Sequence, residues 1–373
     1  MGRSFTNREI VLFVLAAFLL GIAADRFFSL QSGTEDLSGF EPKPVYNLGN
    51  DRYTSDDIDG MISISKPEEV HIARKRALEF LFGSPELPTQ SVSKIDTDVS
   101  GARYRNLPAL KHSRKLLIEM EFGLTSNAYH FVPANSNGAV VLFHEGHTMN
   151  LGMSETRIAQ LLDRGFAVVT FIMPLIGENS RPVVNLKRNG PFRLTDHQNL
   201  GLLKPKSGHA IRYFIEPVIR VMNYLDEHHQ YTNIVMMGIS GGGWTTMITA
   251  ALDERILKSV PVAGSFPFYL RSGITKNWGD FEQIDIRFYS LVNYLELYLM
   301  GSVGKGKAQL QIFNEFDSCC FAGTGSKMYE AVIKRRLKQI SVGGQFDVFL
   351  DGSHQHHEIS DNAMAKILEF LKP

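Results

Sequence analysis

Residues 234–243 read IVMMGISGGG, an apolar run followed at once by glycines around a single serine. The apolar residues 234–237 predict a buried strand, and Ser240 follows in the pattern Gly-x-Ser-x-Gly ahead of a helical stretch. A serine on so sharp a turn has a strained backbone, so the residues two before and two after it must be small, as Gly238 and Gly242 are. The start of the following helix favours negative charge beside the serine. We therefore expect Ser240 to be a nucleophile.

A glycine-rich turn with an incidental serine, or a phosphate-binding loop, would give a similar string. No lysine follows the glycines as a Walker loop requires, and an aspartate and several histidines come later, after other predicted strands. The order serine, acid, histidine along the chain favours the nucleophile.

From Lys115 onward, short β-rich runs alternate with helical stretches, which is typical of an α/β domain with a mainly parallel sheet. Eight strands are expected, near 116–122, 128–132, 139–143, 167–172, 234–237, 259–263, 310–313 and 346–350. Helices on both faces of this sheet are expected near 155–163, 209–227, 244–251, 327–337 and 361–371.

With these motifs, the chain from about Lys115 to its C-terminus resembles the α/β-hydrolase superfamily, over roughly two thirds of the sequence. The resemblance implies an oxyanion hole built partly after the third strand. That strand runs into His144-Glu145-Gly146-His147, and a backbone N–H of Gly146 or His147 could pair with that of Gly241. The sequence does not decide between the two. Zinc is not expected, since H-E-x-x-H needs a spacing of four on a helix and the spacing here is three at a strand end.

The resemblance places the acid just past the seventh strand, where the chain reads Phe-Asn-Glu-Phe-Asp over 313–317. We expect Asp317 to be that acid, because a position beyond the strand end allows its carboxylate to reach the histidine. Glu315 is the alternative.

Three histidines follow the eighth strand, and one of them is expected to be the general base. His357 is the first choice because it stands three residues before Ser360, the expected cap of the closing helix. His354 is the alternative, since it follows the strand directly, and His356 is third. No cofactor and no metal are expected.

The two cysteines, Cys319 and Cys320, are adjacent and cannot build a disulfide framework. In an exported protein they are expected to form a vicinal disulfide that stiffens the approach of Asp317. A pair of buried thiols is the alternative.

The N-terminus carries an export signal: Arg3 and Arg8 precede an unbroken apolar run over 10–24. A cleaved signal peptide and a retained membrane anchor are both open, and the remainder is expected outside the cytoplasm, either membrane-anchored, periplasmic or extracellular. The 39 basic and 39 acidic residues cancel, so nothing suggests a nucleic-acid partner.

Three regions follow from these patterns: a signal peptide or anchor over 1–27, an N-terminal extension over 28–113, and an α/β-hydrolase domain over 114–373. One helix is expected in the extension, beginning after Ser65, with Glu68 at capping-box spacing, and ending at Gly83. The segment from 85 to 114 looks irregular.

Two long excursions interrupt the expected domain. Residues 173–207 carry six basic and two acidic side chains, and residues 266–301 are rich in aromatic side chains. For the basic excursion, solvent exposure is favoured over a contact with an anionic substrate or a lipid headgroup. For the aromatic excursion, packing in the core is favoured over a role in lining a pocket for an acyl or aromatic ester.

The sequence therefore predicts a carboxylesterase-like serine hydrolase that cleaves a small-molecule or acyl ester through an acyl-enzyme on Ser240. A peptidase of the same fold, or a catalytically silent binding module, is the alternative.

Overall fold

The computed structural model describes residues 53–97, 104, 107, 109–147, 151–271 and 275–372. Within these ranges, no helix combines the length and the apolar character needed to cross a membrane. The expected signal peptide or anchor over 1–27 lies outside the described residues and stays a prediction.

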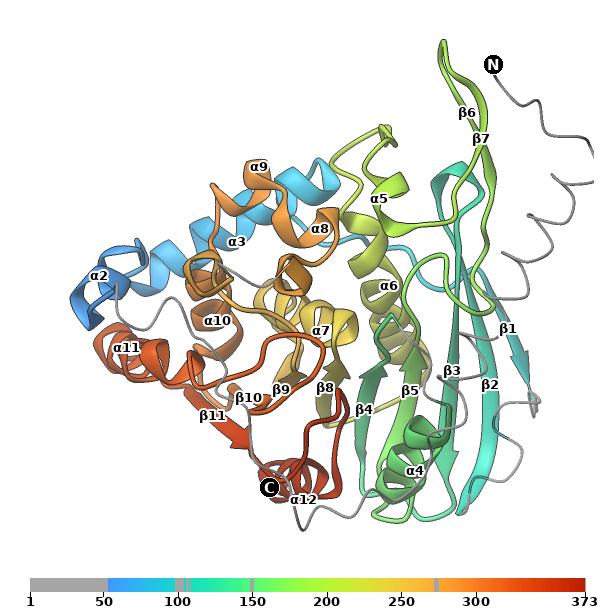
Figure 1. Cartoon of the computed structure of the whole chain (residues 1–373). Coiled ribbons are helices and arrows are strands. Elements are labelled where there is room, and N and C mark those ends of the chain that lie inside the picture. The colour runs from blue at the N-terminus through green and yellow to red at the C-terminus, as the bar shows by residue number, and fades with distance from the viewer. Residues whose placement is uncertain are drawn as a thin grey trace, which may run out of the picture. The chain divides into compact units, whose positions relative to one another are not determined.

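A single large sheet forms the centre of the fold (Figure 1). Its nine strands lie in the order β1 (Lys94–Thr97), β2 (Leu110–Glu119), β3 (Thr125–Pro133), β5 (Ala167–Phe171), β4 (Ala139–His144), β8 (Asn233–Ile239), β9 (Ile256–Val262), β10 (Ala308–Asn314) and β11 (Gln345–Asp351). From β5 to β11 neighbouring strands are parallel, whereas β1, β2 and β3 pair antiparallel, as does β3 with β5. The α/β class and the mainly parallel sheet are confirmed.

The sheet has nine strands where eight were expected. The additional strand, β1, lies in the segment 85–114, which was predicted to be irregular. This four-residue strand has mostly exposed side chains and no apolar alternation, so its sequence carries no strand signal. Backbone pairing with β2, from Lys94 opposite Leu117 to Thr97 opposite Arg114, is what defines it.

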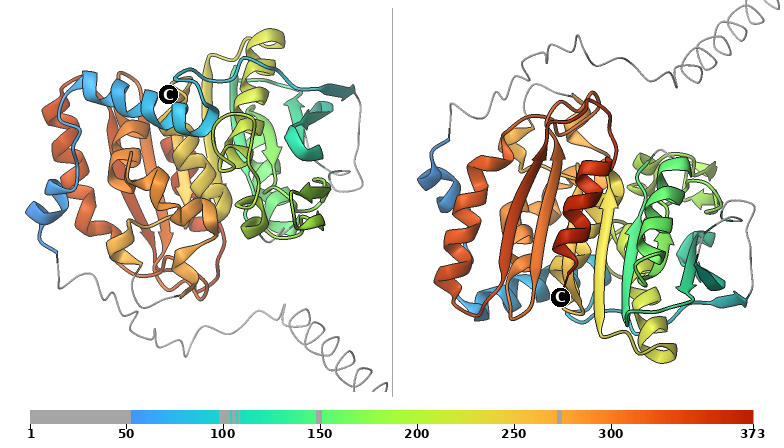
Figure 2. Two further views of the ribbon diagram at one scale, coloured as in Figure 1. Left: turned by 90° about the horizontal axis from the view of Figure 1, so that it is seen from above. Right: turned by 90° about the horizontal axis from the view of Figure 1, so that it is seen from below.

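Helices cover both faces of the sheet, as Figure 2 shows from above and below. One face packs against α4 (Leu151–Leu162) and α12 (Asp361–Phe370). The other packs against α3 (Pro67–Phe82), α6 (Arg212–His228), α7 (Gly241–Leu252), α10 (Tyr294–Ser302) and α11 (Ser326–Ile340), with α2 (Ser55–Gly60) beside α11. Side chains alternate along β4, so that Val141 and Phe143 join the α4 and α12 cluster while Val140 and Leu142 join that of α6. Such two-sided burial explains the continuous apolar runs in the sequence.

Helix α3 begins one residue later than the expected capping box requires. Pro67 has no N–H and occupies the first turn, so the third helical residue is Glu69 and not Glu68. The Glu69 carboxylate accepts the backbone N–H and the hydroxyl of Ser65 at 2.7 and 2.9 Å. Gly83 ends the helix at φ 71°, as predicted. Arg74 donates to the carbonyl of Ala251 at 3.0 Å, which fastens α3 to α7.

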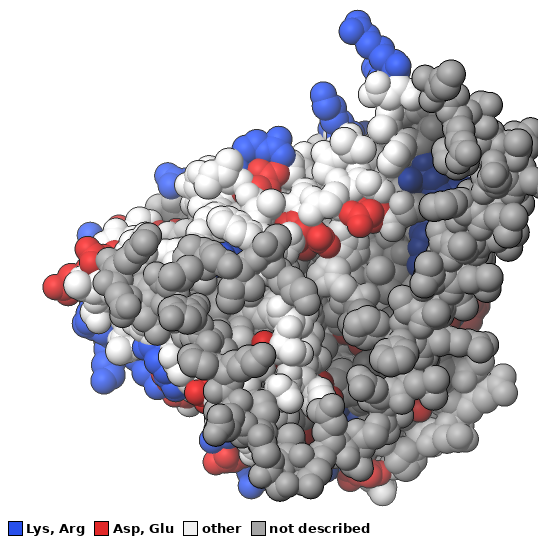
Figure 3. Space-filling model, in the orientation of Figure 1, with Lys and Arg blue, Asp and Glu red and all other residues white. Residues whose placement is uncertain are grey.

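The basic excursion forms a two-stranded hairpin of β6 (Val183–Leu186) and β7 (Gly190–Arg193), followed by the short helix α5 (His197–Leu200). The hairpin projects from the sheet in Figure 1, and Figure 3 shows basic side chains at its tip. Lys187 and Arg188 form the turn between the two strands. The sequence did not predict this hairpin, because polar residues interrupt its strands.

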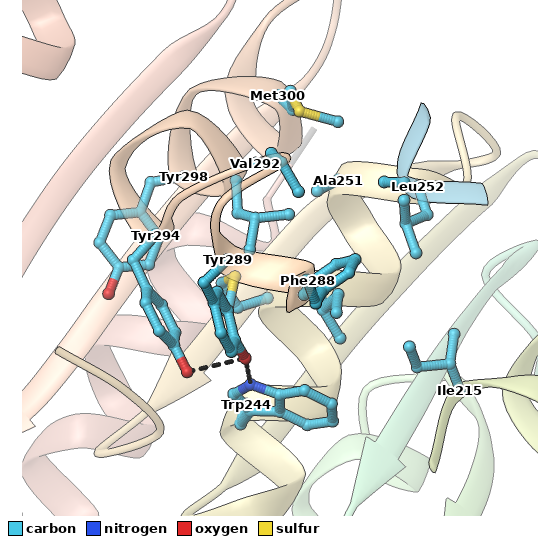
Figure 4. Packing of buried hydrophobic residues seen from close by; sticks show 14 of the residues in the cluster. Ile215, Trp244, Ala251, Leu252, Phe288, Tyr289, Val292, Tyr294, Tyr298 and Met300 are labelled. Atoms are coloured by element: carbon cyan, nitrogen blue, oxygen red, sulfur yellow. Dashed lines mark hydrogen bonds between the residues drawn. The ribbon is translucent and has the colours of Figure 1, made fainter. Parts of the chain in front are cut away.

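The aromatic excursion packs onto α7 through the short helices α8 (Phe281–Ile284) and α9 (Ile286–Tyr289) and through α10. Trp244 of α7 donates its indole N–H to the hydroxyl of Tyr289 at 2.9 Å, and Tyr294 donates to the same oxygen at 2.8 Å (Figure 4). The Tyr289 hydroxyl in turn donates to the carbonyl of Glu282 at 2.9 Å. These aromatic residues are therefore core, and they lock the excursion onto α7.

Candidate active site

Ser240 lies in the sharp turn between β8 and α7, at φ 57° and ψ −124°. A non-glycine residue in this region costs about 1–3 kcal/mol, so the surrounding bonds must hold it there. The backbone N–H of Ser240 donates to the carbonyl of Val262 at 2.9 Å, and its carbonyl accepts the N–H of Trp244 at 2.9 Å. The turn is thus tied to the neighbouring strand and to its own helix.

The glycines around Ser240 are required by close backbone contacts. A Cβ added at Gly242 would collide with the carbonyl oxygen of His144, and one at Gly238 would collide with the carbonyl of Gly242. A Cβ at Gly146 would lie 2.7 Å from the Cβ of Ser240. The loop after β4 and the turn at Ser240 therefore pack backbone against backbone.

We predict that Gly242→Ala lowers the free energy of unfolding by about 1–3 kcal/mol, because backbone must move to admit the new methyl group. Urea denaturation followed by circular dichroism would measure the loss. Gly60→Ala is the matched control, since a Cβ at Gly60 meets nothing within 4 Å, and it should change stability by less than about 1 kcal/mol. Equal stabilities of the two variants would contradict the packing described above.

The structure brings Asp317 and His357 together. The Nδ1 of His357 lies 2.7 Å from the Oδ2 of buried Asp317. The other carboxylate oxygen, Oδ1, accepts the backbone N–H groups of Cys319 and Cys320 at 2.8 and 3.2 Å. The Nε2 of His357 is buried and has no hydrogen-bond partner within the described ranges. This pair has the arrangement expected of an acid that orients a general base.

Asn314, which sequence analysis did not single out, connects the acid loop to the histidine loop. Its side-chain amide donates to Oδ2 of Asp317 at 3.2 Å and to the carbonyls of His356 and Glu358 at 3.1 and 3.0 Å. In the sequence, only the position of Asn314 as the last residue of β10 could have pointed to this role.

Cys319 and Cys320 are bonded to each other, which confirms the expected vicinal disulfide. Their sulfur atoms and a ring nitrogen of His357 lie within 4.8 Å of one another. Because both cysteine N–H groups bind Asp317, the disulfide-linked turn and the acid form one unit.

The alternative residues have other partners. The Nε2 of His354 lies 3.3 Å from Oδ2 of Asp351, at an angle that forms no hydrogen bond. Burial opposes ionisation of Asp351, but hydrogen bonds from Ser353, Ser360 and Asn362 outweigh it and lower the pKa to about 2. Asp351 thus belongs to the cap of α12.

The carboxylate of Glu315 lies over Gly352, where an added Cβ would be 3.1 Å from its Oε2. Of the two acids considered, Asp317 is therefore the one that contacts His357.

In the loop after β4, where the oxyanion donors are expected, the N–H of Glu145 is already bound to the carbonyl of Phe171 at 2.9 Å. His144 is buried, and its Nδ1 donates to the carbonyl of Glu145 at 2.8 Å. Burial lowers the pKa of His144 to about 4, so this ring is neutral and structural. A hydrogen bond within the loop therefore holds this histidine in place.

His147 takes part in a cluster that the sequence did not predict. Its Nε2 lies 3.0 Å from Oδ2 of Asp280, the same oxygen that lies 2.9 Å from Nδ1 of His197. The ligand atoms of these three residues lie within 4.8 Å of one another, so the group is also a candidate for a metal ion. His197 and Asp280 stand 50 and 133 residues beyond His147 along the chain, so no local motif could have found them.

No protein-family model matches the sequence, and no curated protein matches it either. Solved structures do match. Methylesterase BT1017 aligns with a TM-score of 0.61 at 15% identity, over 88% of this chain and 68% of its own. An acetyl xylan esterase from Paenibacillus sp. R4 aligns with a TM-score of 0.52 at 14% identity, over 84% and 98%. A glucuronoyl esterase from Solibacter usitatus aligns with a TM-score of 0.53 at 12% identity, over 81% and 90%.

These matches agree with the strand order, with the strained serine between β8 and α7, and with the helices on both faces of the sheet. The chain has the α/β-hydrolase fold.

Proposed function

We propose that this chain is a serine hydrolase that cleaves carboxylic esters through an acyl-enzyme on Ser240. The observation that carries the proposal is the pair of Asp317 and His357, joined at 2.7 Å, with the far ring nitrogen of His357 left without a partner within the described ranges. In this fold that nitrogen is the one that accepts the serine proton.

The proposed reaction has two halves. His357 Nε2 takes the proton of the Ser240 hydroxyl as Oγ attacks the ester carbonyl carbon, and Asp317 stabilises the resulting imidazolium. The tetrahedral oxyanion is held by the N–H of Gly241 together with that of Gly146 or His147. The bond to the alcohol breaks, and the alcohol leaves with the proton from His357. Water then attacks the acyl group with His357 again as base, which releases the acid and restores Ser240.

The solved structures above support an ester substrate, because they are named as a methylesterase, an acetyl xylan esterase and a glucuronoyl esterase. We therefore propose a small-molecule or acyl ester, and keep a peptide as the alternative.

We also propose that the chain acts outside the cytoplasm, with the apolar run over 10–24 as its export signal or membrane anchor. The disulfide between Cys319 and Cys320 supports this location, since disulfides persist in oxidising compartments.

Labelling of the purified full chain with a fluorophosphonate probe tests the proposal. We expect covalent labelling at Ser240, located by peptide mass spectrometry, and none in Ser240→Ala. A folded wild-type chain that stays unlabelled would indicate a catalytically silent module.

A further inference from the structure

Next to the turn at Ser240 lies a cluster of two histidines and an aspartate whose side chains the proposed reaction does not use. Its three members come from distant segments: His147 from the loop after β4, His197 from the start of α5, and Asp280 from the start of α8. A single oxygen, Oδ2 of Asp280, lies within 3.0 Å of a ring nitrogen of each histidine. The amide of Gln198 approaches the other oxygen at 3.3 Å.

The hydrogen-bond partners of His197 hold its ring at both nitrogens. Its Nε2 lies 2.7 Å from the carbonyl oxygen of Pro174, which can only accept, so this nitrogen must donate. Its Nδ1 lies 2.9 Å from Oδ2 of Asp280. Hydrogen bonds with His147 and His197 hold the pKa of Asp280 well below its usual range.

The side chain of His197 is only 3% exposed. Burial by itself lowers the pKa of His197, but the hydrogen bond to Asp280 is the largest of the effects that oppose burial, and the net effect raises the pKa above its ordinary value.

Four titratable groups face this ring: Asp280, Glu282, His147 and His144. His144 is neutral, as described above. Burial, and then the neighbouring Asp280, raise the pKa of Glu282 to about 8, so Asp280 is the main counter-charge of His197 near neutral pH.

The cluster bears directly on the oxyanion loop. A Cβ at Gly241 would lie 2.6 Å from Cε1 and 2.9 Å from Nδ1 of His147, so the ring covers that glycine. Gly146, the residue before His147 in the chain, packs on Ser240 as described above. The His147 ring therefore connects the loop after β4 to Gly241, and these are the two segments proposed to supply the oxyanion donors.

We propose that His197 is a positioning residue that acts through Asp280 to hold His147 and the oxyanion donors in place around Ser240. We call the contacts that run from His197 through Asp280 to His147 the clamp. The inference rests on the proposed function of that site. We expect loss of the clamp to lower kcat with little change in KM.

Steady-state kinetics on the full chain test this. With p-nitrophenyl acetate as probe, His197→Gln and Asp280→Asn should each lower kcat about ten- to a hundredfold with little change in KM, a smaller effect than the loss of a whole oxyanion donor. Asp280 is partly exposed, so its variant remains informative if His197→Gln does not fold.

His209→Gln is the matched control, because His209 also faces an aspartate, Asp285 at 3.3 Å, but its ring packs on Phe80. A control-like kcat in both cluster variants, or one bound metal ion per chain that is lost in Asp280→Asn, would overturn the inference. The fluorophosphonate probe distinguishes failure of the clamp from failure of the proposed function. A labelled wild type with unaffected cluster variants refutes only the clamp, whereas an unlabelled wild type refutes the hydrolase and the clamp's catalytic role together.

Discussion

Ser240→Ala should abolish nearly all turnover, lowering kcat by about three to six powers of ten, because the members of a triad act as a unit. Without Oγ no acyl-enzyme can form, and only binding and the oxyanion donors remain. Alanine retains the Cβ of serine, so the strained turn and the fold should persist. Steady-state hydrolysis of p-nitrophenyl acetate, with circular dichroism to verify folding, measures the effect.

Ser154→Ala is the control for this substitution. Ser154 is fully buried, and its hydroxyl has no hydrogen-bond partner within the described ranges, so its loss should leave kcat unchanged. Retention of more than about 5% of activity in folded Ser240→Ala would rule out this serine as the nucleophile, given the losses that triad variants show.

His357→Ala should be nearly as damaging as Ser240→Ala, whereas His354→Ala should keep kcat within about threefold of wild type. The reason is geometric: His357 has Asp317 at 2.7 Å on one ring nitrogen and no partner on the other within the described ranges. The Nδ1 of His354 instead accepts the N–H of His356 at 3.1 Å. Parallel kinetics on the two alanine variants would measure this difference.

The double variant Ser240→Ala/His357→Ala sharpens the test. If the two residues belong to one catalytic unit, the double variant should be no slower than either single one. The reverse ranking, in which His354→Ala loses activity and His357→Ala does not, would make His354 the base.

The sequence was most informative where local rules apply. The two-glycine pattern around Ser240 predicted a strained turn, and the structure has that residue at φ 57°. All eight predicted strands of the sheet are present, because each contains a run of mostly apolar residues that is easily recognised. Strand β1 and the hairpin of β6 and β7 were missed, because short and exposed strands depend on a partner and not on an apolar pattern.

The choice of acid and base shows where sequence reasoning reached its limit. Position after a strand end favoured Asp317 over Glu315, and spacing from the closing helix favoured His357 over His354. Both arguments were local, and neither could show a contact. Only the folded chain shows Asp317 against His357, with Asn314 joining their loops.

By itself, the sequence determined the α/β class, the strand-to-helix turn at Ser240 and the chain order of nucleophile, acid and histidines, because these depend on periodicity and on the steric needs of one turn. The tertiary structure alone decided which histidine meets the acid. It also placed His197 and Asp280 beside the oxyanion loop. Hydrogen bonds between loops depend on how distant segments pack, and a single sequence contains no local signal for that packing.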